Sequence, residues 1–258
     1  MAAVLFYLLN YKNNAERALQ SVERDWKINP AESGIYFEYS YPRDLWNKMG
    51  VEAKSNDQKR RVISEMLGSH HFDTSKLASL KSEHAFNAFF IEKARASRDY
   101  IQSPANWSLA QIEKSLPSPS SDKDLLIACK IKWAFKAKPD IVIHADRERA
   151  LCLELKLESG ESSYPSAASE KKLLRKRGLF GEKEKGLSLP MKQTDLQKFL
   201  MADLLGLNCR FRYISRDEES GNECLSWSEF LGMLEPLPNP PSYIQAALNS
   251  MASHCNAE

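Results

Sequence analysis

Two acidic residues and a lysine in the middle of the chain have the types and spacing that phosphodiester hydrolysis requires. Asp140 follows Pro139, and Glu154-Leu155-Lys156 comes one hairpin later. Two converging carboxylates repel each other unless a cation neutralises them. Oxygen ligands of this kind suit Mg²⁺ or Mn²⁺, and such an ion activates water for attack on phosphorus. The residues therefore predict a metal-dependent hydrolytic site in which Lys156 assists the water or stabilises the transition state.

The alternation of residue types predicts how the two acids meet. Leucine occupies every second position from 151 to 157, so Glu154 and Lys156 point to the opposite face of a strand. If Asp146-Arg147-Glu148 forms a three-residue hairpin loop, Asp140 pairs with Glu154. Directly opposed residues have Cβ atoms about 4.5 to 5.5 Å apart on one face, close enough to share a cation. A loop of two or four residues would remove this register.

The D/E-x-K tripeptide is not specific by itself. It occurs five times, beginning at Asp25, Glu52, Asp57, Glu154 and Glu170. Only the copy at Glu154 lies in a clean alternating strand, and Pro139-Asp140 is the only Pro-Asp pair of the chain. The alternative interpretation is an exposed strand with a surface Glu–Lys pair, worth roughly a few tenths of a kcal/mol.

At these residues the sequence resembles the PD-(D/E)xK nuclease superfamily, whose signature is matched by Pro139-Asp140 and Glu154-Leu155-Lys156. The resemblance extends over residues 80 to 215. It implies a restriction-endonuclease-like α/β/α core with a mixed central sheet. It also implies that Asp140 and Glu154 bind the metal, that Leu155 offers its backbone carbonyl, and that Lys156 serves the attacking water.

The same resemblance suggests further site residues on two helices. Many members carry a glutamate on the first core helix, for which Glu83 is the closest candidate and Glu92 the second. Some subgroups carry a glutamine on the second core helix, and Gln193 fits that position, although the tyrosine that follows in those subgroups is absent. Thr194 to Gln197 also fits a capping box, which requires no substrate. Catalysis and helix capping both remain open for Gln193.

A basic insertion, residues 159–190, is expected between the catalytic strand and the second core helix. The window 170–192 holds eight basic and three acidic residues, a net charge of +5 in a chain whose total is +2. Such a segment binds phosphates with strong salt dependence and little sequence preference. The expected nucleic-acid contacts are Lys171, Lys172, Arg175, Lys176 and Arg177. A solvated loop containing a short helix, capped by Ser169 and ended by Gly178, explains the same residues without a ligand.

The elements expected around the site make an α/β protein. Helices are expected at 14–26, 57–67, 82–96, 194–205 and 242–251, and strands at 129–135, 141–143, 150–157 and 209–214. The strand at 129–135 is inferred from the alternation of Ile131, Trp133 and Phe135 with other residues. The aromatic run from Tyr36 to Trp46 fits either a strand or the wall of a pocket.

This order divides the chain into three parts: a mainly helical N-terminal extension over 1–78, a nuclease-like core over 79–235, and a Pro-rich connector with a tail over 236–258. An apolar content of 43% with 36 basic and 34 acidic residues excludes a disordered chain. The longest apolar run, Met1 to Leu9, is far shorter than the roughly 20 residues of a membrane-spanning helix. It also lacks a secretory signal pattern, so a cytoplasmic protein without membrane contact is expected.

The function expected from these features is that of a Mg²⁺-dependent endonuclease acting on DNA. One alternative is a protein that binds nucleic acid, or acts as a scaffold, and keeps the nuclease-like fold without cutting. Another is a catalytic subunit that requires a targeting partner, since the N-terminal third contains no recognised DNA-reading module. A homodimer is compatible with each of these hypotheses.

Overall fold

The computed structural model describes residues 2–39, 41–116, 121–156, 162–180, 189–215 and 224–253. The chain folds into two compact units. The first comprises Met1–Tyr39, Lys138–Glu161 and Met201–Glu258, and the second comprises Ser40–Ala137 and Ser162–Leu200. The chain therefore leaves the first unit and returns to it twice. The unit boundaries, which follow residues 39, 137, 161 and 200, do not coincide with the expected boundaries after residues 78 and 235.

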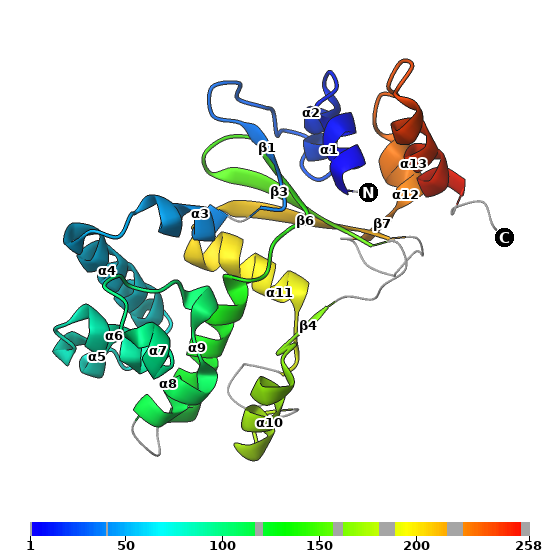
Figure 1. Cartoon of the computed structure of the whole chain (residues 1–258). Helices are drawn as coiled ribbons and strands as arrows, with labels where there is room; N and C mark the ends of the chain where they lie inside the picture. Colours follow the sequence, from blue (N-terminus) through cyan, green and yellow to red (C-terminus); the bar gives the residue numbers. More distant parts are fainter. Residues whose placement is uncertain are drawn as a thin grey trace. The chain divides into compact units, whose positions relative to one another are not determined.

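A mixed five-stranded sheet forms the centre of the first unit (Figure 1). Its strands, in order across the sheet, are β1 (Gly34–Phe37), β2 (Ile141–His144), β3 (Arg149–Leu155), β6 (Asn208–Ser215) and β7 (Cys224–Ser226). β1, β2 and β3 are antiparallel neighbours, whereas β6 runs parallel to β3 and β7 parallel to β6. The expected mixed α/β class is confirmed, and so are the strands at 141–143 and 209–214. The strand expected at 150–157 is present as β3 and ends at Leu155, and residue 157 lies outside the described residues.

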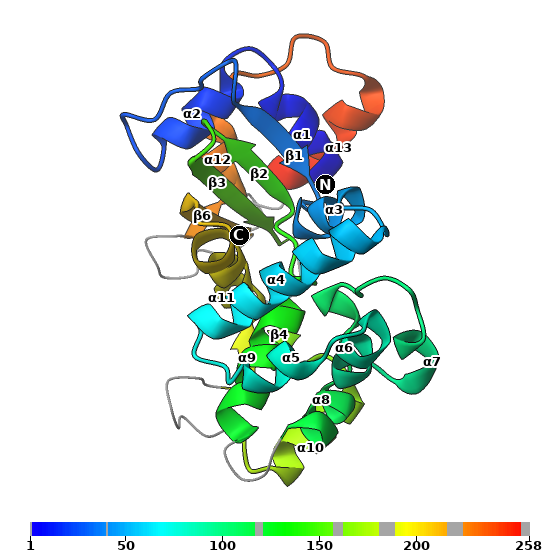
Figure 2. The same cartoon turned by 90° about the vertical axis from the view of Figure 1, so that its left-hand side faces the viewer.

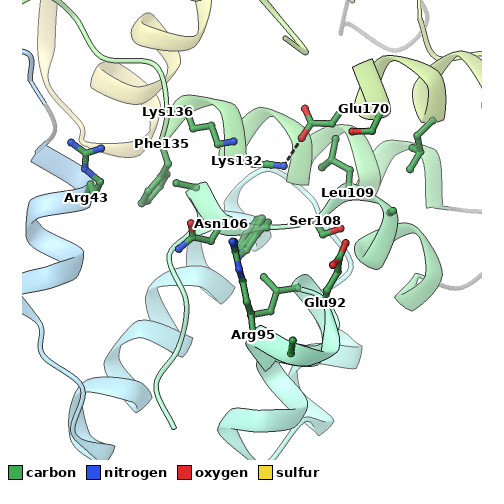
Figure 3. Close-up of a pocket in the computed structure, with 17 residues that line it drawn as sticks. Arg43, Glu92, Arg95, Asn106, Ser108, Leu109, Lys132, Phe135, Lys136 and Glu170 are labelled. Carbon is green, nitrogen blue, oxygen red and sulfur yellow. Dashed lines mark hydrogen bonds and ion pairs between the residues drawn. The ribbon is translucent and has the colours of Figure 1, made fainter. Parts of the chain in front are cut away.

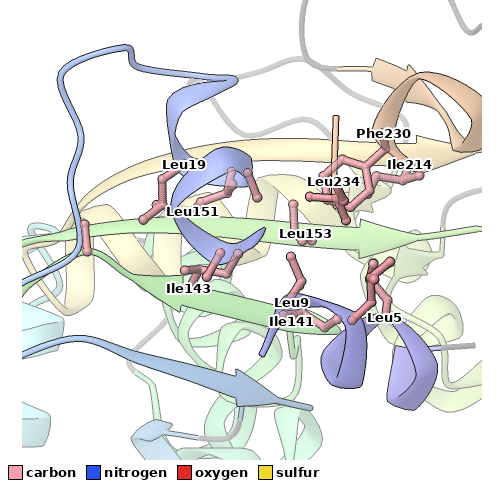
Figure 4. Close-up of a cluster of buried hydrophobic side chains, with 14 of the residues drawn as sticks. Leu5, Leu9, Leu19, Ile141, Ile143, Leu151, Leu153, Ile214, Phe230 and Leu234 are labelled. Carbon is pink, nitrogen blue, oxygen red and sulfur yellow. The ribbon is translucent and has the colours of Figure 1, made fainter. Parts of the chain in front are cut away.

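Helices from both ends of the chain cover one face of this sheet (Figure 4). They are α1 (Ala2–Leu9), α2 (Asn14–Gln20), α12 (Trp227–Gly232) and α13 (Ser242–Ser253). Ile141, Ile143, Leu151 and Leu153 point to this face and are fully buried. Because side chains alternate along a strand, the even-numbered positions of β2 and β3 point to the other face.

The other face of the sheet carries a smaller apolar cluster. Val142, Ala150 and Cys152 are buried there together with Tyr39 and Met201. β3 is therefore apolar on both faces, as expected for a strand in a sheet that is covered on both sides. A polar side chain on this face lies in a partly covered environment.

The second unit is mainly helical (Figure 2). It contains α3 (Tyr41–Lys48), α4 (Ala53–Ser69), α5 (Ser75–Ser79), α6 (Glu83–Phe90), α7 (Lys93–Ala96), α8 (Leu109–Ser115), α9 (Ser121–Ala134), α10 (Ala168–Lys176), α11 (Gln193–Lys198) and a small sheet of β4 (Ser163–Tyr164) and β5 (Met191–Lys192). A π-helical segment, Phe199–Leu204, follows α11, and its residues from Met201 on belong to the first unit. The helix expected at 82–96 is interrupted at Ile91, and Ser82 caps its first part by accepting a hydrogen bond from Ala85 N at 3.1 Å.

The strand expected at 129–135 is wrong, because residues 121–134 form α9. This helix is buried on nearly all sides, and even Lys132 is only 6% exposed. A helix without a polar face leaves no 3.6-residue pattern in the sequence. The alternation of apolar residues with Lys130 and Lys132 therefore has the two-residue period of a strand, although the segment is a buried helix.

The third antiparallel strand is instead β1, which belongs to the N-terminal part of the chain. The ladder pairs Ile35 with Ile143, and α1 and α2 pack in the same core. Residues 1–39 are therefore part of the sheet unit and not an extension added to it. Of the aromatic run, Tyr36 and Phe37 end this strand, whereas Tyr41 and Trp46 lie in α3, so the strand interpretation holds only for the first part of the run.

Candidate functional site

The hairpin between β2 and β3 has the register that brings Asp140 opposite Glu154. Ile141 pairs with Leu153, and the ladder closes around a three-residue loop, residues 146–148. Extending the ladder by one position places Asp140 opposite Glu154. The loop length and pairing predicted from the sequence are both confirmed.

Asp140 and Glu154 lie on the same face of the sheet. Asp140 stands two residues before Val142, and Glu154 stands two residues after Cys152. Val142 and Cys152 are buried in one cluster on that face. Because side chains repeat every second residue along a strand, the two carboxylates project to the same side.

The contacts around the two acids connect them to the end of β3. Leu155 N donates a hydrogen bond to Asp140 Oδ2 at 2.8 Å. Lys156 Nζ lies 2.8 Å from Glu154 Oε1. Asp140, Glu154 and Lys156, which the sequence selected, are thus brought together within the first unit.

The backbone of Lys156 is held on both sides. Its N–H donates to Ile214 O at 2.8 Å, and its carbonyl accepts a hydrogen bond from Trp227 Nε1 at 3.0 Å. Trp227 is 1% exposed and belongs to the core of the unit. The side chain of Lys156 therefore extends from a backbone whose N–H and carbonyl are both hydrogen-bonded.

The acidic site is largely removed from solvent. Glu154 is 4% exposed, and the side chain of Lys156 is 15% exposed. Burial raises the pKa of the Asp140 carboxyl, and the Leu155 hydrogen bond and the charge of Lys156 offset this rise only in part. The alternative of an exposed surface Glu–Lys pair does not agree with this burial.

A third acid, Glu38, borders the site and was missed by sequence reasoning. Glu38 N donates to Asp140 O at 2.8 Å, which places Glu38 opposite Asp140 at the end of β1. Its negative charge contributes to the raised pKa of Asp140, although its own carboxylate is exposed and lies 3.6 Å from Lys138 Nζ. The available signal was the aromatic run at Tyr36, since a strand there would have indicated that Glu38 lies at its end.

The donor set fits a divalent cation that retains water ligands. Among the residues that the structure describes, no group of three or more His, Cys, Asp or Glu side chains is arranged to hold a metal ion. The predicted ligands are the carboxylates of Asp140 and Glu154, with the Leu155 carbonyl as a predicted third ligand. Mg²⁺ is typically bound by one or two carboxylates together with waters and substrate phosphates.

Glu83, Glu92 and Gln193 belong to the second unit, and their roles as site residues stay predictions. α6, which begins with Glu83, follows β1 in the chain. This helix precedes only β2 and β3 of the three antiparallel strands, and a role of Glu83 in the site stays a prediction. Gln193 begins α11 after Lys192, which makes no side-chain capping bond, so the expected capping box is not formed. A catalytic role of Gln193 stays a prediction.

The basic segment forms α10 and the turn that follows it. α10 begins at Ala168 without a cap from Ser169, and Gly178 ends the turn with φ of 68°, as expected. Arg177 is engaged by Glu113 Oε1 at 2.9 Å and Asp122 Oδ1 at 3.6 Å. Lys172, Arg175 and Lys176 are exposed, whereas Lys171 is half-buried. Residues 159–161 and 181–188 of the insertion lie outside the described residues.

Comparison of the chain with family models, curated proteins and solved structures gives no match. In the described part of the chain, no helix is both long enough and apolar enough to cross a membrane. The chemistry of the site is therefore inferred from its residues and their geometry.

Proposed function

We propose that the chain is a divalent-metal-dependent nuclease of the PD-(D/E)xK type that hydrolyses phosphodiester bonds in DNA. The observation that carries this proposal is the register of the β2–β3 hairpin, which sets Asp140 and Glu154 on one face. Lys156 Nζ, 2.8 Å from Glu154 Oε1, adds the third group of the signature.

Each residue of the site has a separate role in this proposal. Asp140 and Glu154 would hold Mg²⁺ or Mn²⁺, which when bound supplies positive charge for the phosphate and makes water more acidic. Leu155 N–H fixes one oxygen of Asp140, so the carboxylate is oriented before any ligand arrives. Glu154 holds the Lys156 ammonium, which would position the attacking water or donate to a phosphate oxygen as negative charge develops.

The charge balance of the site supports a bound cation. Lys156 compensates one negative charge, whereas Asp140 and Glu154 carry two when both are ionised. Glu38 has its own neighbour in Lys138. Burial of an uncompensated charge is costly, and proteins pair such groups, bind metals with them or shift their pKa values. Burial raises the pKa of Asp140, and a bound cation would favour its ionised form.

α10 provides the surface that we assign to nucleic-acid binding. Lys172, Arg175 and Lys176 project from it into solvent. Exposed cations of this kind neutralise phosphates and release counterions, which gives affinity without sequence preference. Arg177, by contrast, is held by Glu113 and Asp122 and has a structural role.

The test is cleavage of supercoiled plasmid and of single-stranded DNA in the presence of Mg²⁺. Lys156→Ala should lose most of the activity because the attacking water loses its partner. Lys27→Ala is the matched control, since Asp25-Trp26-Lys27 has the same spacing but both its charged residues are exposed. Equal cleavage by the wild-type protein and Lys156→Ala would refute the proposal.

A second candidate function is nucleic-acid binding without cleavage. The exposed cations of α10 favour it, because they lie on a helix that contains none of the site's acids. A salt-dependent DNA affinity that Asp140→Ala leaves unchanged, together with no cleavage under Mg²⁺ or Mn²⁺, would support this function over the first.

A further inference from the structure

The second unit contains a cavity of about 770 Å³ that is separate from the acidic site. Residues from α3, α7, α8, α9, α10 and the segment before α8 line it (Figure 3). Pockets of roughly 300 to 1,000 Å³ are typical of small-molecule sites in proteins. The size of the cavity is therefore suitable for a ligand as large as a mononucleotide.

Positive charge predominates along the described lining of this cavity. Its charged residues are Arg43, Arg95, Lys132, Lys136, Glu92 and Glu170. Figure 3 shows Lys132 and Lys136 above the cavity and Arg95 and Glu92 below it. The lining thus has two more cations than acids.

Glu170 does not reduce the charge available to a ligand, because it is already fully engaged. Its Oε1 accepts from Lys132 Nζ, and its Oε2 accepts from Trp133 Nε1 at 2.9 Å. Lys132 is 6% exposed, so this pair forms part of the wall. The remaining cations are Arg43, Arg95 and Lys136, opposed only by Glu92.

These three cations are available to an anion. In the described parts of the chain, none of Arg43, Arg95 and Lys136 forms an ion pair with an acidic residue. Partial burial lowers the pKa of Lys136, the charge of Lys132 lowers it further, and Glu170 opposes the shift. An anion beside Lys136 would favour its charged form.

The uncharged part of the lining includes apolar surface with an aromatic wall, besides Asn106, Ser108 and Ser169. Ile91, Leu109 and Phe135 contribute apolar surface. The Phe135 ring is fixed by an edge-on contact with Trp46, with centroids 6.3 Å apart and planes at 84°. A ligand that fits both parts combines an anionic group with a flat ring.

We propose that this cavity binds a nucleoside 5′-monophosphate, with the phosphate between Arg95 and Lys136 and the base against Phe135. The shared chemistry is a terminal phosphate joined to a nucleoside, which is offered either by a free nucleotide or by the 5′ end of a strand. The proposal does not depend on the nuclease function, because every lining residue belongs to the second unit.

Calorimetric titration of the full chain without divalent metal tests this proposal. AMP should bind saturably and at least about tenfold more tightly than inorganic phosphate or adenosine, since only AMP uses both parts of the cavity. Lys136→Gln and Arg95→Gln should each weaken AMP binding by about tenfold, the usual loss for one charged hydrogen bond. Neither side chain lies in the core or forms an ion pair in the described residues, so neither change leaves a buried partner charge.

Lys54→Gln, an exposed lysine of α4 that does not line the cavity, is the matched control and should bind AMP like the wild type. A 5′-phosphorylated tetranucleotide and its unphosphorylated form identify the source of the phosphate. If the phosphorylated tetranucleotide binds more tightly than AMP, the site is assigned to strand ends. If AMP binds more tightly, the site is assigned to free nucleotides. No saturable binding of either ligand, equal affinity for AMP and phosphate, or unchanged affinity in both variants would overturn the proposal.

Discussion

Each unit of the molecule contains a largely buried lysine–glutamate pair, but the two pairs have different neighbours. In the second unit, Lys132 and Trp133 engage the two oxygens of Glu170. In the first unit, Lys156 engages Glu154, and a further acid, Asp140, lies directly opposite on the next strand. In the described residues, Asp140 forms no ion pair of its own.

This difference separates a structural ion pair from a candidate reactive one. A buried pair whose polar atoms are satisfied maintains the fold, and removal of one partner is strongly destabilising. Burial raises the pKa of Asp140, and the charge of Glu38 adds to this rise; such perturbed groups concentrate at functional sites. We therefore propose the Glu154 site, and not the Glu170 site, as the cation-binding centre.

The largest expected effect is loss of cleavage when either acid of the first site is neutralised. Asp140→Asn and Glu154→Gln should each lower the rate of plasmid cleavage under Mg²⁺ by about 10³-fold, or roughly 4 kcal/mol of transition-state stabilisation. Asp25→Asn, in another D-x-K tripeptide, should cleave at the wild-type rate. If Asp140→Asn cleaves plasmid at a rate within tenfold of wild type, the Lys156–Glu154 pair is not the reactive one and does not differ in function from the Lys132–Glu170 pair.

The second-largest effect is expected on the free energy of unfolding, at the Lys132–Glu170 pair. Glu170→Ala leaves Lys132 buried without its partner and should lower the free energy of unfolding by about 3 to 5 kcal/mol. Glu154→Ala should cost less, because it also removes the repulsion between Glu154 and Asp140. Urea denaturation of both variants measures this difference, and an equal or larger loss in Glu154→Ala would contradict the comparison.

Metal binding at Asp140 and Glu154 should appear as a gain in the free energy of unfolding. Mg²⁺ at about one hundred times its dissociation constant should raise the free energy of unfolding of the wild type by about 2.7 kcal/mol. Asp140→Asn and Glu154→Gln should lose this gain, whereas Lys27→Ala should keep it. Thermal denaturation with and without Mg²⁺ measures the effect. Stabilisation of all variants to the same extent would place the ion elsewhere.

The raised pKa of Asp140 predicts a smaller effect of pH without metal. A carboxyl whose pKa is higher in the folded state than in the unfolded state binds more protons when folded. The free energy of unfolding should therefore fall as the pH rises from the ordinary carboxyl pKa through the raised value. Asp140→Asn should reduce this fall. Urea midpoints between pH 4 and pH 7 test the prediction, and identical profiles for the two proteins would refute it.

The smallest effect is expected on the basic helix. Changing Lys172, Arg175 and Lys176 to glutamine should reduce the salt dependence of DNA affinity, by up to about 0.9 in the log–log slope for each phosphate that the variant no longer neutralises. Arg177→Gln should chiefly lower stability, because Arg177 contacts Glu113 and Asp122. Fluorescence anisotropy at several salt concentrations measures the slope. An unchanged slope in the triple variant would exclude α10 as the DNA-binding surface.

The acidic site could be predicted from the sequence because its geometry is local. The β2–β3 hairpin needs only a three-residue loop and strict alternation to set Asp140 opposite Glu154. Both properties are visible in a short stretch of chain, and the structure confirms them.

The remaining architecture depends on contacts that no short window of sequence contains. β1 joins β2 although about a hundred residues separate them, so Glu38 could not be connected with Asp140. α9 was misread because burial removed its polar face. The cavity of the second unit was missed because its lining combines residues from several helices, each of which looks ordinary by itself.

The central claim is that Asp140 and Glu154 share one divalent cation. Anomalous diffraction from crystals grown with Mn²⁺ tests it directly. The account predicts a single strong peak between the two carboxylates that is absent in Glu154→Gln. A structure with Mn²⁺ bound elsewhere, and with Asp140 and Glu154 contacting only Leu155 and Lys156, would contradict it.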